Sequence, residues 1–386
     1  MSLKRSNVFE ILEGAEEFPA VGLLGSRQTG KTTLSRLIFK NHAYVSLEDI
    51  GSRTAATIDP RTFLSSNRNS YGIIIDDFHY APELLSYLQS EGLAKNKKGE
   101  FILCGPQNTY NEDLLKNCFG ENISIHIIFP LSLQELSANY QLPNHIDELI
   151  FKGLYPAVHA QHEDICHYYR NLISTYIDKD VRLYGQVENV TTFHSFLTAC
   201  ARRVGQVINS TALALECGIS DHTVRRWLDL LEEQGIIFLQ KPYHTSFGKR
   251  LIKSPKLYFF DTGIICSLLK IEKQNVPNHP LKDAFFQTLI MSELWRWAVL
   301  SKKDIHVYFW RDKTEHEIEC LIEHGNILIP LKIALSAQEN FLNAFKYWSK
   351  LSDNHGNSYT VVSESKREEN QLSWQYLQPL YKAIAH

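Results

Sequence analysis

The stretch Ala20-Val21-Gly22-Leu23-Leu24-Gly25-Ser26-Arg27-Gln28-Thr29-Gly30-Lys31-Thr32-Thr33 decides the fold. Its second part matches the pattern G-x-x-x-x-G-K-[ST] and lies between an apolar run typical of a buried strand and a segment with helical spacing. In that context the backbone N–H groups of residues 28–33 form a nest for a β-phosphate, at the positive end of a helix dipole. We therefore expect residues 25–33, the phosphate loop, to bind ATP. The Lys31 ammonium would contact the β- and γ-phosphates, and the Thr32 hydroxyl would ligate Mg²⁺.

Short apolar runs continue outward from this loop across residues 18–136. They are apolar at consecutive positions, which is typical of strands buried on both faces of a parallel sheet. The runs are Ala20–Leu24, Ala43–Leu47, Gly72–Ile75, Phe101–Leu103 and Ile125–Phe129. Segments with helical spacing, Lys31–Lys40 and Pro82–Ser90, lie between them. The pattern predicts an α/β nucleotide-binding domain in which helices cover a parallel sheet.

Two acidic residues, Asp76 and Asp77, follow the apolar run that begins at Gly72. This run places Asp76 at the carboxyl end of a buried strand, where its carboxylate would hold Mg²⁺ through water. Most ATPases of this kind have Glu at the next position to polarise the attacking water, whereas Asp77 is one methylene shorter. We expect Asp77 and Lys31 to be the catalytic residues. Either Asp77 uses a slightly repositioned water, or hydrolysis is slow.

Several motifs together resemble a known family. In the first half they are the phosphate loop, Tyr44-Val45-Ser46-Leu47-Glu48-Asp49, Asp76-Asp77 with Ala81-Pro82-Glu83-Leu84-Leu85, and Pro130-Leu131-Ser132-Leu133-Gln134-Glu135-Leu136. In the second half they are 176–182, 223–228 and 248–263. The chain resembles the prokaryotic predicted ATPases of the AAA superfamily that carry a C-terminal domain of unknown function. This resemblance implies an AAA-type P-loop domain, a winged helix and a C-terminal fold similar to restriction endonucleases.

The AAA resemblance also points to a sensor and shows one departure. A polar residue after the fourth strand commonly reports on the γ-phosphate in this class, so Gln107 and Asn108 are candidate sensors. An ordinary strand-to-loop turn is the alternative. Where relatives commonly have a Gly-Arg pair before the fifth strand, this chain has Gly120-Glu121. We expect the substitution to remove a positive charge near the phosphates, which would weaken hydrolysis more than nucleotide binding.

The segment Ser210–Leu228 is typical of a helix, a glycine-containing turn and a second helix. Ser220 is a natural N-cap for the second helix, whose polar face carries Arg225 and Arg226. From Thr191 to Lys256 there are nine Lys and Arg residues against five acidic residues, opposite in sign to the whole chain. Arg225 and Arg226 are therefore candidate contacts to nucleic-acid phosphates. A protein-docking or structural role of the winged helix is the alternative.

The C-terminal part lacks the residues of a working nuclease. A restriction-endonuclease-like site needs acids that bind magnesium and a lysine that polarises water. Glu293 and Glu319 occupy two of the acidic positions, but Lys332 stands where the next acid should be and Ala334 where the lysine should be. We expect no nuclease activity. The nearby acids form a solvated strand face in this interpretation, and they are Glu315, Glu317, Glu319 and Glu323.

Composition limits the remaining possibilities. Hydrophobic residues make up 44% and charged residues 22%, which are ordinary globular values. The net charge of −3 excludes nonspecific nucleic-acid binding by the whole molecule. The seven cysteines show no C-x-x-C pair, which excludes a disulfide scaffold and a zinc ribbon and favours a reducing cytoplasm. No apolar run approaches the ~20 residues of a membrane span, and acidic residues replace the apolar core of a signal peptide. We predict a cytoplasmic protein without a membrane partner.

These observations predict three domains: an AAA-type P-loop ATPase domain (1–145), a helical region with a winged helix (146–275) and a degenerate restriction-endonuclease-like α/β domain (276–386). The predicted function is slow, magnesium-dependent ATP hydrolysis coupled to the other two domains. A non-hydrolysing, nucleotide-dependent protein-docking switch and a DNA-dependent ATPase are the alternatives. The expected ligands are ATP and Mg²⁺, and the open partners are DNA and a second protein.

Overall fold

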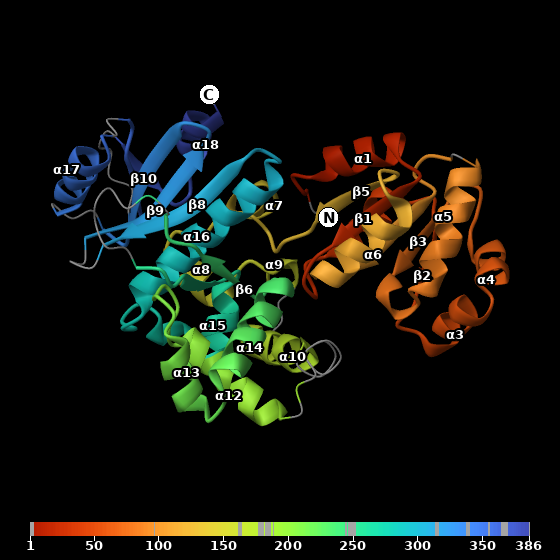
Figure 1. Ribbon diagram of the computed structural model, residues 1–386, viewed down its shortest axis with the longest axis horizontal. Helices are drawn as coiled ribbons and strands as arrows, with labels where there is room; N and C mark the ends of the chain where they lie inside the picture. Colours follow the sequence, from red (N-terminus) through yellow and green to blue (C-terminus); the bar gives the residue numbers. More distant parts are fainter. Residues whose placement is uncertain are drawn as a thin grey trace. The chain divides into compact units, whose positions relative to one another are not determined.

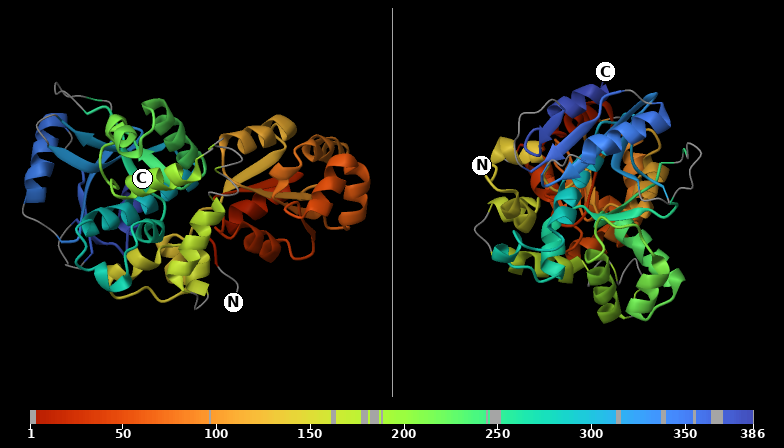
Figure 2. Two further views of the ribbon diagram at one scale, coloured as in Figure 1. Left: turned by 90° about the horizontal axis from the view of Figure 1, so that it is seen from below. Right: turned by 90° about the vertical axis from the view of Figure 1, so that its left-hand side faces the viewer.

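The computed structural model describes residues 4–95, 97–160, 164–176, 181, 187, 189–243, 245, 252–312, 316–336, 340–353, 356–363 and 370–385. The chain divides into two compact units (Figures 1 and 2). Unit 1 comprises Met1–Tyr140, Tyr155–Ala160 and Glu233–Gly235. Unit 2 comprises Gln141–Leu154, Gln161–Glu232 and Ile236–His386.

Unit 1 is built on a parallel sheet of five strands in the order β2-β3-β4-β1-β5. The strands are β1 (Ala20–Leu24), β2 (Ala43–Ser46), β3 (Ile73–Asp76), β4 (Phe101–Gly105) and β5 (Ile123–Ile127). The five strands expected from the sequence are confirmed, with ends that differ by one or two residues. Because β1 is an inner strand, flanked by the parallel strands β4 and β5, the phosphate loop leaves the sheet at its carboxyl edge, where α/β proteins bind ligands.

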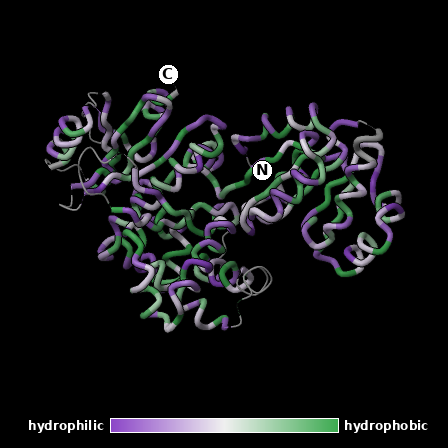
Figure 3. Tube along the Cα trace, in the orientation of Figure 1, coloured by the Kyte–Doolittle hydropathy of each residue, from purple (hydrophilic) through white to green (hydrophobic). Residues whose placement is uncertain are grey.

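Helices cover both faces of this sheet, as expected. One apolar core joins α1 (Val8–Glu17) and α2 (Lys31–Ile38) to side chains such as Val21 and Leu23. The core on the other face includes Ala20 and Leu24 and the helices of the α3–α6 region. These are α3 (Ile50–Ile58), α4 (Pro60–Asn67), α5 (Glu83–Lys95) and α6 (Thr109–Phe119). The inner strands are accordingly coloured as hydrophobic in Figure 3. The short helix α7 (Leu133–Asn139) follows β5, and α9 (Pro156–Ala160) also belongs to this unit.

Unit 2 begins with a helical part. It contains α8 (Ile146–Lys152), α10 (Ile165–Tyr176), α12 (Val190–Ala201), α13 (Ser210–Cys217), α14 (Asp221–Glu233) and α15 (Thr262–Leu268). The helix–turn–helix expected from the sequence is α13 and α14, joined through Gly218, whose φ of 65° closes α13. The Ser220 hydroxyl accepts a hydrogen bond from the Thr223 N–H (3.0 Å) at the start of α14. Trp227 of α14 packs edge-on against Phe193 and Phe196 of α12. The antiparallel pair β6 (Ile237–Gln240) and β7 (Lys256–Phe259) follows.

The C-terminal part of unit 2 contains a mixed sheet in the order β12-β11-β10-β9-β8. Its strands are β8 (Ile305–Arg311), β9 (Glu317–His324), β10 (Ile327–Ala334), β11 (Tyr359–Val362) and β12 (Gln371–Ser373). Strands β8, β9 and β10 pair antiparallel, and β10, β11 and β12 pair parallel. Helix α16 (Lys282–Leu300) packs on β8 and β10, α17 (Asn340–Ser352) packs on β9, and α18 (Gln378–Ala385) ends the chain. Among the described residues, no helix is long and apolar enough to cross a membrane.

Candidate functional site

The phosphate loop joins the buried strand β1 to helix α2. Gly30 has a φ of 95° at the start of α2, and Gln28 has a φ of 60°, so the loop winds tightly before the helix. A Cβ at Gly25 would lie 2.2 Å from the Ile128 carbonyl oxygen, so only glycine fits there. The Thr29 hydroxyl donates to the Ser26 carbonyl (3.0 Å) and closes the turn. The loop therefore has the tight geometry that a nest of backbone N–H groups requires.

Lys31 is held by this loop at the first position of α2. Its ammonium donates to the carbonyl oxygens of Gly25 and Ser26, at 2.8 Å each. Burial lowers the pKa of Lys31, while the Asp76 carboxylate opposes the decrease. A cation that is partly desolvated at the mouth of a backbone nest is suited to bind an anion.

Thr32 and Asp76, the two predicted magnesium residues, are in direct contact. The Thr32 hydroxyl donates to Asp76 Oδ2 (2.5 Å), although the residues are 44 positions apart. Both present oxygen atoms, which Mg²⁺ prefers, so the residues present fit this metal. Tyr44, the second residue of β2, donates through its hydroxyl to the same Oδ2 atom (3.1 Å). Burial and the Asp76 carboxylate raise the pKa of Tyr44, so its hydroxyl stays protonated as a donor. No spacing pattern in the sequence indicates this role of Tyr44.

Asp77 lies directly beyond the magnesium residues. Its backbone is left-handed (φ 57°, ψ 42°), and its N–H donates to Asp76 Oδ1 (3.2 Å). Burial, and then the neighbouring Asp76 carboxylate, raise the pKa of Asp77 to about 6. A carboxylate with a pKa near this value is suited to accept a proton close to neutral pH. His79, two residues further on, is also buried, and burial together with Arg27 lowers its pKa to about 3.

The candidate sensors follow β4, beside the loop. The Gln107 N–H donates to the Gly25 carbonyl (3.3 Å), which joins this segment to the start of the phosphate loop. Asn108 is 5% exposed, and its Oδ1 accepts from the Asn111 N–H (2.7 Å) and caps α6. Its buried Nδ2 has no hydrogen-bond partner among the described residues. Asn108 is thus both the turn residue of the alternative interpretation and a donor that is available to a ligand.

We expected Gly120-Glu121 to remove a positive charge near the phosphates, and for the phosphate loop of this chain that expectation is wrong. These residues precede β5, and Ile123 pairs with Ala20 at the amino edge of the sheet. The phosphate loop leaves the opposite, carboxyl edge after Leu24. A charge at position 121 therefore lies far from this loop, because the length of β1 and β5 separates them.

The sequence of residues 17–137 matches the family model described as an AAA domain. Residues 17–137 are an AAA domain. Two further matches cover 143–275 and 282–381, and each is described as a domain of unknown function (DUF8612 and DUF4143). The chain is thus an AAA-superfamily ATPase with a C-terminal DUF4143 domain, and its AAA domain contains every residue of the phosphate site.

Relatives with similarity over most of the chain carry no assigned function in their names. The uncharacterized proteins Rv2008c of Mycobacterium tuberculosis and Mb2031c of Mycobacterium bovis are each 26% identical over 309 residues, which is 79% of this chain and 68% of theirs. The Walker-type ATPase PABY2304 of Pyrococcus abyssi is similar with a TM-score of 0.45 and 16% identity, over 69% of this chain and 96% of that chain. The Thermotoga maritima RuvB Holliday junction branch migration motor has a TM-score of 0.34 and 17% identity, over 62% of this chain and 90% of that chain. The family models, not these two structures, assign the AAA domain.

Outside the AAA domain, ion pairs neutralise much of the basic cluster around α14. Arg225 pairs with Asp221 (2.6 Å), and both Arg202 and Arg203 pair with Glu216. Lys256 is buried and pairs with Glu317, so it is not on a binding surface. Arg226 is exposed. Two more of the counted basic residues, Lys249 and Arg250, lie outside the described residues.

The acids of the C-terminal domain do not form a solvated strand face, so that expectation is wrong. Lys332 donates to Glu319 Oε1 (2.8 Å) and to the Glu317 carbonyl (2.9 Å), and the side chains of Glu317 and Glu319 are each 18% exposed. Glu317 also pairs with Lys256 and Arg311. These ion pairs hold the two carboxylates largely away from solvent. A sequence pattern cannot show such pairing, because the basic partners lie on other strands or at distant positions. Glu315 lies outside the described residues.

Glu293, the expected acid on the helix, is also paired. Arg296 of the same helix contacts it at 2.8 Å, and both side chains are almost fully buried. Among the described residues, no group of three or more His, Cys, Asp or Glu side chains is placed to hold a metal ion. The Lys332 ammonium lies beside Glu319, at the place where a nuclease would need a divalent metal ion.

Proposed function

We propose that the chain binds ATP with Mg²⁺ at the phosphate loop and hydrolyses it slowly, and that the nucleotide state is coupled to the rest of the chain. The observation that carries the proposal is the 2.5 Å contact between Thr32 and Asp76 beside the ammonium of Lys31. It brings together, from distant parts of the sequence, a hydroxyl, a carboxylate and a cation at one edge of the AAA sheet. Bound Mg²⁺ would neutralise charge on the phosphates, and Thr32 and Asp76 would hold it.

The chain's own residues divide the remaining work. Residues 28–33 would hold the phosphates through backbone N–H groups, and Lys31 would leave the loop carbonyls to contact them. Asp77 would accept a proton from the attacking water, with its pKa of about 6 as support. The shorter reach of Asp77 supports a slow rate. Asn108 Nδ2, with Gln107 beside it, is the proposed contact to the γ-phosphate.

The test is to measure nucleotide binding by calorimetry and phosphate release with the chain of residues 1–386. Lys31→Ala removes charge-assisted hydrogen bonds, each worth about 1.5–3 kcal/mol, so the Kd for ATP should rise at least roughly ten-fold. Lys116→Ala is the matched control, because Lys116 is exposed and pairs with Glu112 on the surface of α6. Equal ATP affinity in the wild type and Lys31→Ala would contradict the proposal.

A second candidate is a non-hydrolysing switch in which the helix–turn–helix, proposed to be a winged helix, docks a protein. The ion pairs of Arg225, Arg202 and Arg203 favour it over a DNA-dependent ATPase, because the paired carboxylates lower the local positive potential that attracts nucleic-acid phosphates. ATPase assays with and without duplex DNA at several salt concentrations separate the candidates. If DNA binds, replacing Arg225 and Arg226 with alanine should reduce the salt slope by up to about two units. Absence of duplex binding at low salt would leave a protein-docking or a purely structural role for the winged helix.

We also propose the division into domains 1–145, 146–275 and 276–386, which the family matches at 17–137, 143–275 and 282–381 support. In this proposal the last domain is a restriction-endonuclease-like scaffold without nuclease activity. The Lys332–Glu319 pair supports it, because a lysine in place of a carboxylate replaces a metal ligand with a positive charge. The seven unpaired cysteine thiols are compatible with the proposed cytoplasmic location.

A further inference from the structure

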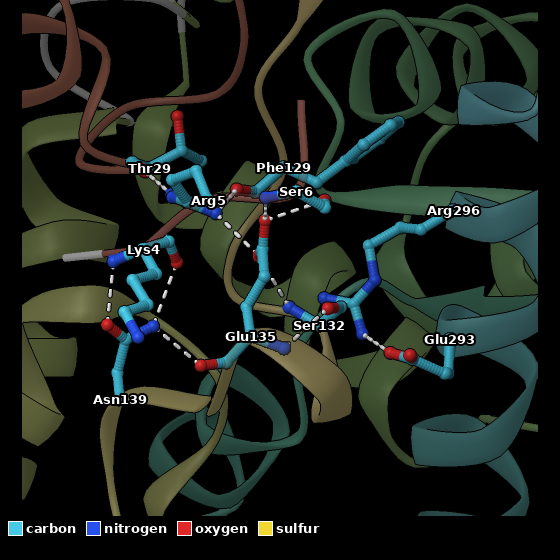
Figure 4. A network of polar contacts seen from close by, with 10 residues as sticks. All are labelled: Lys4, Arg5, Ser6, Thr29, Phe129, Ser132, Glu135, Asn139, Glu293 and Arg296. Carbon is cyan, nitrogen blue, oxygen red and sulfur yellow. Dashed lines mark hydrogen bonds and ion pairs between the residues drawn. The ribbon is translucent and has the colours of Figure 1, made fainter. Parts of the chain in front are cut away.

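Arg5, which precedes α1 in the chain, reaches the phosphate loop from outside the motif. Its guanidinium donates through Nη2 to the Thr29 carbonyl, and through Nη1 to the Phe129 carbonyl (3.0 Å) and Glu135 Oε2 (3.0 Å) (Figure 4). The Arg5 side chain is 4% exposed and that of Glu135 is 8% exposed. A buried guanidinium with fixed partners is a rigid fork, so it holds the Thr29 carbonyl in one direction.

Glu135 makes this anchor rigid. Its Oε1 accepts from the Ser6 N–H (2.8 Å) and the Ser6 hydroxyl (2.9 Å), and its Oε2 accepts from the Ser132 N–H (3.0 Å). The Ser132 hydroxyl accepts in return from the Glu135 N–H, which forms a capping box at the start of α7. Next to it, Lys4 and Asn139 exchange two hydrogen bonds of 2.6 and 2.8 Å (Figure 4). Residues 4–6 are thus tied to α7 on one side and to the phosphate loop on the other.

Peptide geometry gives the Thr29 contact a consequence for phosphate binding. The peptide between Thr29 and Gly30 is planar and trans, so its C=O and N–H point in opposite directions. By holding the carbonyl of Thr29, Arg5 therefore also fixes the direction of the Gly30 N–H on the opposite side of the same peptide plane. Gly30 has a φ of 95° and no Cβ, so without the anchor this peptide plane has more freedom to turn.

We propose that Arg5 is a positioning residue that fixes the Thr29–Gly30 peptide so that the Gly30 N–H is available to the β-phosphate. The inference rests on the proposed nucleotide binding. It assigns to a segment before the AAA domain a part in phosphate affinity, with Glu135 as its buried support. Arg5 itself does not touch the nucleotide in this proposal.

The test compares Arg5→Lys and Arg5→Met with the wild type in the chain of residues 1–386. Lysine keeps the charge beside Glu135 but loses the fork that reaches both Glu135 and Thr29. The Kd values for ATP and for ADP, both with Mg²⁺, should rise by the same factor of roughly ten, because the nest binds the β-phosphate that both nucleotides share. The thermal unfolding midpoint without nucleotide reports the structural effect separately. Arg68→Met is the matched control, because Arg68 pairs with Glu100 (3.5 Å) in the same unit, away from the loop.

Two results would overturn the proposal. A rise confined to ATP would make Arg5 a direct γ-phosphate contact, and unchanged affinities in a folded Arg5→Lys would make its role purely structural. If Arg5→Met fails to fold, Arg5→Lys still decides between these results. Failure of the proposed function is a different outcome, because then the wild type itself would bind neither ATP nor ADP.

Discussion

Replacing Tyr44 with phenylalanine tests whether the magnesium carboxylate is held in place by its neighbours. Asp76 Oδ2 accepts two hydrogen bonds, from Thr32 (2.5 Å) and from Tyr44 (3.1 Å), and the substitution removes only the second. The ring stays under the guanidinium of Arg36, 4.8 Å from its centroid, so packing is retained. Any loss therefore reports the hydroxyl rather than the side chain as a whole.

The magnitude follows from the geometry. A hydrogen bond to a charged group contributes about 1.5–3 kcal/mol, but Tyr44 is 39% exposed and its bond is long, so about 1 kcal/mol is expected. This corresponds to a roughly five-fold weaker affinity of the protein–ATP complex for Mg²⁺. ATP affinity without Mg²⁺ should not change, because Tyr44 has no part in the phosphate nest.

The assay is a titration of Mg²⁺ into the protein at fixed ATP, followed by the fluorescence of a labelled nucleotide or by phosphate release. Tyr71→Phe is the control, because Tyr71 is 56% exposed and precedes β3 at the other edge of the sheet. The same magnesium dependence in Tyr44→Phe and in the wild type would refute the reasoning, since Asp76 would then need no second donor.

Three further predictions concern single carboxylates and the C-terminal domain. Asp77→Asn should stop phosphate release while ATP affinity is retained, and an unchanged rate would place the general base elsewhere. Glu135→Gln should lower the free energy of unfolding at pH 7 by about 3 kcal/mol. Burial alone would raise the pKa of Glu135, but the Arg5 guanidinium and the Ser6 and Ser132 N–H groups outweigh it and lower that pKa. The stabilisation is therefore fully present above the ordinary value of 4.5 and is lost progressively as the pH falls through the lowered pKa of the folded state, so a difference between variant and wild type that does not shrink between pH 7 and pH 3.5 in urea unfolding would contradict this cause. Finally, the purified protein should not nick supercoiled plasmid with Mg²⁺ or Mn²⁺, and nicking that Glu293→Gln abolishes would make the domain a nuclease.

The sequence predicted those parts of the site that are contiguous along the chain. Five apolar runs gave the parallel sheet, and the phosphate loop followed from its glycines and Lys31. The Tyr44–Asp76 and Arg5–Glu135 contacts join residues 32 and 130 positions apart, so no local spacing encodes them. The resemblance drew attention to Tyr44 within a motif, but only the fold shows which carboxylate its hydroxyl meets.

Helices with few buried residues also could not be predicted from apolar periodicity. In α1 the described helix buries only Ile11 and Gly14, so its apolar periodicity is weak and its acidic residues dominate. The C-terminal acids show the opposite difficulty, because Glu317 and Glu319 alternate with apolar residues as they would on a solvated strand. Lys332 and Lys256 contact them from other strands. Because of these tertiary partners, the two glutamate side chains are mostly buried although their sequence pattern predicts exposure.

The backbone at position 77 gives a physical reason for the shorter acid that follows Asp76. A φ of 57° and a ψ of 42° place this residue in the left-handed region, which Asp adopts several-fold more readily than most residues. Glutamate would reach further toward an attacking water but would carry a backbone cost of about 1 kcal/mol in this conformation. The N–H that Asp77 donates to Asp76 depends on the same turn. The geometry therefore favours a fixed position of the Asp76 carboxylate over a longer reach of the residue 77 side chain, which supports the proposed slow hydrolysis.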